Sequence, residues 1–298
     1  MARYITPAIT PLTEKRQIDE EAVFALYDHL VQGGVDGILT LGSIGEFFAL
    51  PMNEKKHLVR AAVQACAHRL PLLVGTGSTV LSDVLELSEE ALSRGADAVI
   101  IVPPYYFSHT AADMEAWYGE IARRIPGRIY LYNFPDRTGY AIAPETVLRL
   151  RQQYENIVGI KDTISGMDHT RELIDLIKPQ YPDFEIYSGF DDNFAHNVLS
   201  GGDGCIAGLS NVLPGLCSAW RKAAEQGNMK QVAEMQQKVN RLMRIYGVGS
   251  PFVPFIKAAT ALMGVPVSCA CTAPLPVPTR EQIDRIADIL RQEGFSPA

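Results

Sequence analysis

Lys161 is the residue of this sequence whose surroundings most directly suggest chemistry. It follows residues 157–160, a short apolar run rich in β-branched side chains, which predicts a buried strand. Lysine is almost never fully buried without a partner, and desolvation disfavours its charged form. The neutral amine can attack a ketone and form a Schiff base. The run alone leaves a second interpretation open, in which Lys161 lies one residue past the strand and points to water.

Hydroxyl groups and one guanidinium follow other predicted strands. Ser43 lies in the glycine-rich loop 42–46, and Tyr132 and Arg137 follow one strand together. In Schiff-base chemistry the amine condenses with a 2-oxo acid, and a phenol can donate and accept the protons. Backbone N–H groups of the loop could hold a carboxylate, and Arg137 could pair with a second anion. A core position for Tyr132 and a solvated position for Arg137 are the alternatives.

Histidine is absent from the predicted strand ends. The six histidines fall on predicted helices or in loops beyond the strands, with no HxH or HExxH pair. A divalent-metal aldolase or hydrolase needs imidazoles or clustered carboxylates at that place. We therefore expect no metal and no other cofactor. Glu46, Asp162 and Asp191 could in principle meet, so a metal-dependent barrel lyase stays open as a competing hypothesis.

Eight strand–helix units must position these residues. Strands are predicted at 5–10, 37–41, 71–75, 98–102, 128–133, 157–163, 184–189 and 204–208. Alternation without a strand–strand hairpin implies a parallel sheet with crossover helices. Eight units within residues 1–225 predict an α/β protein with a closed (β/α)8 TIM barrel. A doubly wound sheet is disfavoured because no glycine fingerprint follows the first strand.

The alternation ends after residue 225. Helices are predicted at 229–246, 251–263 and 279–291, so we expect a catalytic barrel over 1–225 and a C-terminal three-helix region over 226–298. This region would pack on the barrel or on a neighbouring subunit. Asn53 is expected to cap the helix after the second strand. Lys257 is expected to lay its stem along apolar surface and reach water with its charge.

Composition limits the class of protein. With 47% hydrophobic and 20% charged residues, the chain resembles ordinary globular enzymes. A net charge of −7 gives no basic surface for nucleic acid or anionic membranes. Five cysteines without framework spacing favour a reducing, cytoplasmic location. No apolar stretch approaches the ~18 residues of a membrane span, and no signal peptide is expected.

Five motifs occur along the chain: GSIGE (42–46), YNFPDRTG (132–139), GIKDT (159–163), SGFDD (188–192) and GGDGCIAGLSN (201–211). In order and spacing, over essentially the whole chain, they resemble the dihydrodipicolinate synthase / N-acetylneuraminate lyase family of pyruvate-dependent class I lyases. The resemblance implies that Lys161 forms the Schiff base with pyruvate or another 2-oxo acid.

The resemblance also implies roles for other residues. Tyr132 would be the proton shuttle, and Ser43 would stand where the family has a threonine or serine that relays protons to it. Tyr106 matches a family tyrosine that can reach a neighbouring subunit's site. Ile206 would line the Schiff-base pocket, and Gly189 is expected among the substrate-binding residues. The usual assembly of the family is a homotetramer.

Two residues point to different substrates. Arg137 resembles the arginine that, in the synthases, holds the carboxylate of the aldehyde substrate. Ile44 stands where the synthases carry threonine, and it can offer only a backbone N–H. The GSxGEF, YNFP, KDTI and GGDG details are more like the 2-keto-3-deoxy sugar acid aldolases.

We therefore expect an aldolase that cleaves a 2-keto-3-deoxy sugar acid to pyruvate and an aldehyde. The alternative is a 4-hydroxy-tetrahydrodipicolinate (dihydrodipicolinate) synthase, which condenses pyruvate with aspartate semialdehyde in lysine biosynthesis. A catalytically silent barrel that binds a 2-oxo acid as a sensor is a further hypothesis. The intact set of Ser43, Tyr132 and Lys161 argues against it, because a pure binder needs no proton relay.

Overall fold

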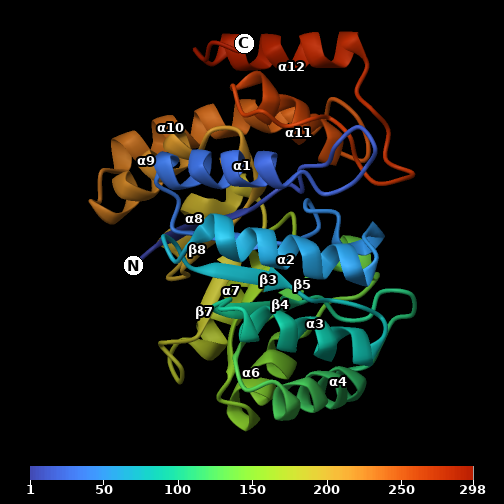
Figure 1. Cartoon of the computed structure of the whole chain (residues 1–298). Coiled ribbons are helices and arrows are strands. Elements are labelled where there is room, and N and C mark those ends of the chain that lie inside the picture. Colours follow the sequence, from blue (N-terminus) through green and yellow to red (C-terminus); the bar gives the residue numbers. More distant parts are fainter. Residues whose placement is uncertain (298) are drawn as a thin grey trace.

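The chain folds into a closed barrel of eight parallel strands surrounded by helices (Figure 1). The computed structural model describes residues 1–297. Each strand pairs with the next, and β8 pairs with β1 to close the barrel. The strands are β1 (Arg3–Pro7), β2 (Gly37–Thr40), β3 (Leu72–Gly75), β4 (Ala98–Ile101), β5 (Arg128–Asn133), β6 (Ile157–Asp162), β7 (Glu185–Ser188) and β8 (Gly204–Ile206). The predicted (β/α)8 barrel is confirmed.

The barrel helices follow the strands in the predicted order. They are α1 (Glu20–Gly33), α2 (Met52–Cys66), α3 (Leu81–Ser93), α4 (Ala111–Arg124), α5 (Pro135–Thr138), α6 (Pro144–Gln153), α7 (Asp168–Ile177), α8 (Phe194–Leu199) and α9 (Pro214–Glu225). Short 3-10 turns η1 (Phe47–Ala49), η2 (Asp191–Asn193) and η3 (Gly208–Asn211) follow β2, β7 and β8.

Local sequence explains most helix boundaries. Asp19 caps α1 by accepting a hydrogen bond from the Ala22 N–H, and Gly34 ends this helix in the left-handed conformation. The predicted cap at Asn53 is wrong, because α2 begins one residue earlier and its N-cap is Pro51. Extended backbone at Pro51 already turns the chain into the helix, so Asn53 lies inside the first turn.

The C-terminal helices gather on one side of the barrel, near α1 and α9 (Figure 1). They are α10 (Met229–Leu242), the 3-10 turn η4 (Met243–Ile245), α11 (Val253–Leu262) and α12 (Arg280–Gln292). Helix α10 packs against α9 and α12, and α11 packs against η3. One continuous apolar core includes residues on both sides of residue 225, so a domain boundary there stays a prediction. Among residues 1–297, no helix is long and apolar enough to cross a bilayer.

The expectation for Lys257 is wrong. Its side chain lies on α11 with 0% exposure and pairs with Glu46 instead of reaching water. The expectation assumed an open surface on this helix, but the segment around Ala270 and Thr272 covers it. The Ala270 carbonyl oxygen accepts a hydrogen bond from the Lys257 amine, and the Thr272 N–H donates one to Glu46.

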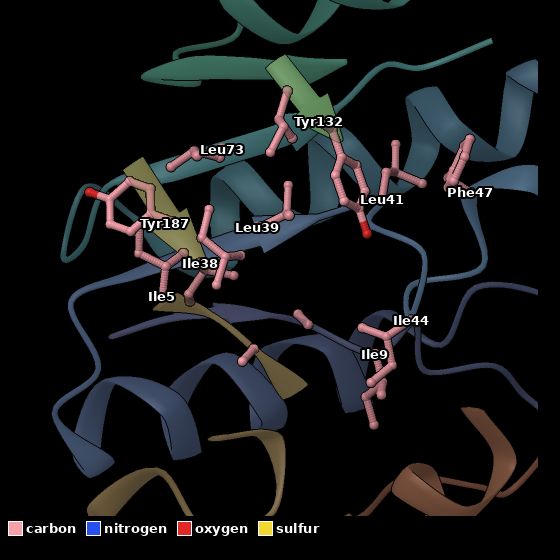
Figure 2. Packing of buried hydrophobic residues seen from close by; sticks show 14 of the residues in the cluster. Ile5, Ile9, Ile38, Leu39, Leu41, Ile44, Phe47, Leu73, Tyr132 and Tyr187 are labelled. Carbon is pink, nitrogen blue, oxygen red and sulfur yellow. The ribbon is translucent and has the colours of Figure 1, made fainter. Parts of the chain in front are cut away.

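Buried side chains from successive strands and their loops fill the barrel and its surroundings (Figure 2). At the end where β1, β5 and β7 begin, the Glu185 carboxylate closes the barrel. It accepts hydrogen bonds from the phenols of Tyr130 (2.6 Å) and Tyr187 (2.7 Å) and pairs with Arg3 and Arg128. The opposite end, where the strands finish, is the place at which barrel enzymes carry their chemistry.

Candidate active site

Lys161 and Tyr132 face each other across neighbouring strands. They are direct register partners near the ends of β5 and β6. The Lys161 amine lies 3.3 Å from the Tyr132 hydroxyl oxygen and 4.4 Å from the centre of its ring. Lys161 is only 4% exposed, so the interpretation that it points to water is wrong. A buried amine beside a phenol is an arrangement that supports nucleophilic attack and proton transfer.

Ser43 extends this pair into a chain of three groups. Its hydroxyl oxygen lies 3.2 Å from the hydroxyl oxygen of Tyr132. Figure 2 shows the Tyr132 ring beside Leu39 and Leu41, with its hydroxyl directed to the side of the barrel where Ile44 lies. The three predicted catalytic residues Ser43, Tyr132 and Lys161 are therefore brought together.

The loop that carries Ser43 has a constrained backbone. Leu41 and Glu46, which flank glycines 42 and 45, adopt positive φ angles of 55° and 60°. Such angles are unfavourable for side chains other than glycine and persist only where the surroundings hold them. Gly75 on β3 allows the close approach, because a Cβ there would lie 2.0 Å from the Leu41 carbonyl oxygen.

These groups open into a cavity of about 310 Å³, a volume at the lower end of small-molecule sites. Its lining residues are Pro7, Ser43, Ile44, Tyr132, Phe134, Asp136, Arg137, Lys161, Thr163, Gly189, Phe190, Asp191, Gly208, Met243, Tyr246 and Phe252. Six of the eight predicted site residues are among them. The other two, Tyr106 and Ile206, are not.

Tyr106 and Ile206 lie elsewhere in the chain. Tyr106, on the loop after β4, is 85% exposed and contacts Phe107 edge to face. Ile206 is fully buried within β8, opposite Ile5 in the ladder, and Gly208 lines the cavity in its place. The lining role expected for Ile206 stays a prediction, since β8 ends there and Gly208, two residues later, lines the cavity.

Gly189 is required by close packing. A Cβ at this position would lie 1.8 Å from the Thr163 hydroxyl oxygen and 2.9 Å from its Cα. Within residues 1–297, the buried Thr163 hydroxyl has no hydrogen-bond partner. A buried polar group without a partner costs free energy, so this hydroxyl is free to bind a ligand in the cavity.

Arg137 lies on α5, a single helical turn where the sequence predicted a loop. Pro135 opens this turn and Gly139 ends it in the left-handed conformation. The Arg137 guanidinium is exposed and lies 5.3 Å from the ring centre of Phe134. Phe134 in turn stacks on Tyr132 at 5.9 Å. Arg137 therefore stands at the open side of the cavity, whereas Lys161 lies at its buried side.

A polar network behind Lys161 fixes the neighbouring residue Asp162. The carboxylate accepts hydrogen bonds from Asn133 (2.7 Å) and Thr170 (2.6 Å), and His169 Nδ1 lies 3.0 Å away. His169 Nε2 lies 3.0 Å from the carbonyl oxygen of Ile142. Both ring nitrogens face acceptors, so the doubly protonated imidazolium satisfies both. The sequence missed this residue because it lies on the helix that follows the strand.

The pH dependence of stability should report this network. Burial lowers the pKa of His169, but the hydrogen bond and charge of Asp162 outweigh it, and the net pKa lies above the ordinary 6.5. A raised folded-state pKa gives stability that is fully present below about pH 6.5 and is lost as the pH rises through the folded pKa. Urea unfolding from about pH 5 to about pH 8 should show wild type losing its advantage over His169→Gln as the pH rises. A constant difference would contradict the ion pair.

Asp191 lines the cavity together with the C-terminal region. Its buried carboxylate accepts hydrogen bonds from the Tyr4 phenol, the Tyr246 phenol (2.9 Å) and the Leu209 N–H (2.9 Å). Burial raises the pKa of Asp191. Tyr246, Met243 and Phe252 bring the C-terminal region to the cavity. No strand-end pattern could identify these three residues, because their helices follow the barrel.

Metal ligands are not gathered here. Within residues 1–297 there is no group of three or more His, Cys, Asp or Glu side chains that could hold a metal ion. Glu46, Asp162 and Asp191 each bind donors of the chain instead.

Comparisons with known proteins identify the family of the chain. The Dihydrodipicolinate synthetase family model matches residues 1–293. The "Probable 2-dehydro-3-deoxy-D-pentonate aldolase YjhH" of Escherichia coli is 34% identical, over 98% of this chain and 97% of that protein. A 4-hydroxy-tetrahydrodipicolinate synthase of Kosmotoga olearia is 38% identical over 86% of each chain.

A solved structure has the same sequence identity to this chain as YjhH. The crystal structure of YagE, a prophage protein of the dihydrodipicolinic acid synthase family from Escherichia coli K12 in complex with pyruvate, superposes with a TM-score of 0.96. It is 34% identical, and 98% of each chain is covered. YagE carries a provisional name as a 2-dehydro-3-deoxy-D-gluconate aldolase. With a family model over nearly its whole length, the chain belongs to the dihydrodipicolinate synthetase family.

Proposed function

We propose that this protein is a class I lyase in which Lys161 forms a Schiff base with a 2-oxo acid and cleaves a 2-keto-3-deoxy sugar acid. The observation that carries the proposal is the buried Lys161 amine 3.3 Å from the Tyr132 hydroxyl, which lies 3.2 Å from Ser43. Lys161 is the nucleophile, Tyr132 the proton shuttle and Ser43 the relay to it.

The reaction follows from these positions. The neutral amine attacks the C2 ketone, water leaves and an iminium forms. Tyr132 takes the proton of the C4 hydroxyl, the C3–C4 bond breaks and its electron pair moves into the iminium, which becomes an enamine. The aldehyde departs, the enamine is protonated at C3, and water releases pyruvate and restores the amine. The cavity excludes bulk water from Lys161 during these steps.

Borohydride reduction in the presence of pyruvate tests the proposal. We expect a stable adduct with the mass of reduced pyruvate, located on the peptide that carries Lys161, because hydride reduces the iminium. The absence of an adduct, or an adduct on another lysine, would overturn the proposal. An adduct without turnover of any aldehyde partner would support the sensor hypothesis instead.

The substrate assignment rests on Ile44 and on the relatives. Ile44 is buried in the cavity wall, so the loop presents an aliphatic side chain where a synthase would present a hydroxyl. YjhH and YagE are named as aldolases of 2-dehydro-3-deoxy sugar acids. The synthase is the second candidate, and Arg137 at the cavity entrance is the observation that favours it.

Arg137→Ala distinguishes the two candidates. In the aldolase, kcat/KM for the sugar acid should fall less than about tenfold, because the departing aldehyde carries no carboxylate for Arg137 to bind. In a synthase, loss of a charge-assisted hydrogen bond should cost condensation with aspartate semialdehyde about tenfold or more. Assays with sugar acids, sialic acid and the semialdehyde measure this, with exposed Arg285→Ala on α12 as the control. Wild-type preference for the semialdehyde would contradict the aldolase.

Assembly and location are part of the same proposal. We propose a cytoplasmic homotetramer. The exposed Tyr106 and Phe107 supply apolar surface for a subunit contact, and all five cysteines are free thiols, which suits a reducing compartment. Light scattering should give the mass of four chains. A monomer that retains full activity would contradict both the assembly and a role for Tyr106 in a neighbouring site.

A further inference from the structure

The second buried lysine of the chain forms an ion pair with a residue of the loop that carries Ser43, outside the cavity lining. Lys257 Nζ lies 2.5 Å from Glu46 Oε1, and both side chains are 0% exposed. Burying two charges is unfavourable unless they are paired and their remaining hydrogen-bonding groups are satisfied. Lys257 does not line the cavity, so its amine is not a second Schiff-base nucleophile. The pair needs another explanation.

The remaining groups of the pair are bound by one C-terminal segment. Glu46 Oε2 accepts hydrogen bonds from the Thr272 N–H (2.6 Å) and the Thr272 hydroxyl (2.8 Å). Lys257 donates a further hydrogen bond to the carbonyl oxygen of Ala270 (2.7 Å). We call Glu46, Lys257 and Thr272 the loop clamp. It joins three segments that are far apart in the sequence: the loop after β2, helix α11 and the chain before α12.

The loop clamp holds the strained end of the loop that carries Ser43. Glu46 has a φ of 60°, which an ordinary side chain adopts only where contacts impose it. The Glu46 N–H donates a hydrogen bond to the Ser43 carbonyl oxygen at 3.2 Å. Thr10 holds the adjacent residue by donating a hydrogen bond to the Gly45 carbonyl oxygen at 2.6 Å. A shift of Glu46 therefore moves Ser43 directly.

We infer that the loop clamp is a positioning device, which keeps the Ser43 hydroxyl within hydrogen-bond reach of Tyr132 by tying the loop to the C-terminal region. The inference rests on the proposed Schiff-base function. It assigns Glu46, Lys257 and Thr272 to proton relay through Ser43 and not to contact with substrate. The C-terminal region then contributes to the reaction twice, by lining the cavity and by fixing the relay.

Pyruvate alone is the probe for the test, so the aldehyde partner need not be known. Borohydride trapping measures Schiff-base formation at Lys161. Deuterium exchange at the pyruvate methyl group in heavy water, followed by NMR, measures proton transfer at C3. Amide hydrogen exchange of residues 42–50 measures how firmly the loop is held, independently of activity.

The variants are Glu46→Gln, Lys257→Met, the double variant and the milder Thr272→Val, with exposed Lys230→Met on α10 as the matched control. We expect Glu46→Gln and Lys257→Met to retain the Lys161 adduct but to lose methyl exchange by about 10²-fold, the cost of a displacement near 1 Å. Their loop amides should exchange faster. The double variant should be more heat-stable than either single variant, because neither charge is left unpaired.

Thr272→Val keeps the test decisive if a single charge variant fails to fold. It removes one hydroxyl donor and leaves the ion pair, so a smaller loss of methyl exchange and faster loop amide exchange are expected. Methyl exchange and loop protection equal to wild type in the folded variants would overturn the inference while leaving the Schiff-base proposal intact. A wild-type protein without an adduct would overturn the proposed function, and the amide exchange would still decide whether the clamp holds the loop.

Discussion

Lys161→Arg should abolish turnover while leaving the barrel folded. Arginine keeps the positive charge and much of the stem, but its guanidinium stays protonated and cannot attack a carbonyl. We expect kcat/KM to fall by about 10⁴-fold or more, the scale of losing a covalent nucleophile. The borohydride adduct with pyruvate should disappear. Both readouts depend on the same amine, which lies 4% exposed beside Tyr132.

Circular dichroism and thermal melting control for folding in this experiment, and Lys230→Arg on the exposed start of α10 controls for the substitution itself. Residual turnover above one-hundredth of wild type would contradict the role of Lys161. An adduct that persists on another peptide would place the nucleophile elsewhere.

Tyr132→Phe should separate proton transfer from packing. The ring keeps its stacking on Phe134, but the hydroxyl that links Lys161 to Ser43 is gone. Loss of a general acid–base group predicts a fall in kcat of about 10² to 10⁴-fold. The adduct at Lys161 should still form, more slowly, because dehydration of the carbinolamine also needs a proton donor.

Tyr154→Phe is the matched control for Tyr132→Phe. Tyr154 is half-buried after α6, accepts one hydrogen bond from Arg123 and does not line the cavity. Its loss should cost about 1 kcal/mol of stability without changing kcat. Equal rates in the two variants would rule out Tyr132 as the shuttle.

The barrel and the three central site residues could be predicted because both follow from the local pattern of apolar and polar residues. Short apolar runs that alternate with amphipathic segments leave few topologies besides a parallel barrel. Once the strands are ordered, their ends must meet at one face, so Lys161, Tyr132 and Ser43 converge there. An error of one or two residues in a predicted strand end does not change this prediction, because the side chains of Lys161 and Tyr132 still lie near the ends of their strands.

The rest depends on contacts between segments that the sequence pattern does not join. The pairing of Lys257 with Glu46, and the arrival of Tyr246 and Phe252 at the cavity, require knowing where α11 and its neighbours pack. An apolar face on a helix indicates that the helix packs against other elements, but it does not indicate which ones. The sequence pattern alone therefore predicts a surface position for Lys257. Tyr106 stays untested, because its expected contact involves another subunit.

The network around Glu185 bears on the route by which ligands come and go. Because Arg3, Arg128, Tyr130 and Tyr187 bind this carboxylate at the start of the strands, the barrel axis offers no rear exit. The cavity has the exposed Arg137 on one side and Lys161 at its buried side, where pyruvate would stay bound covalently. A cleaved aldehyde must therefore leave before pyruvate, and in the reverse direction pyruvate must enter first. Steady-state kinetics of condensation should accordingly show ordered addition with pyruvate first, and aldehyde at high concentration should inhibit by occupying the empty site.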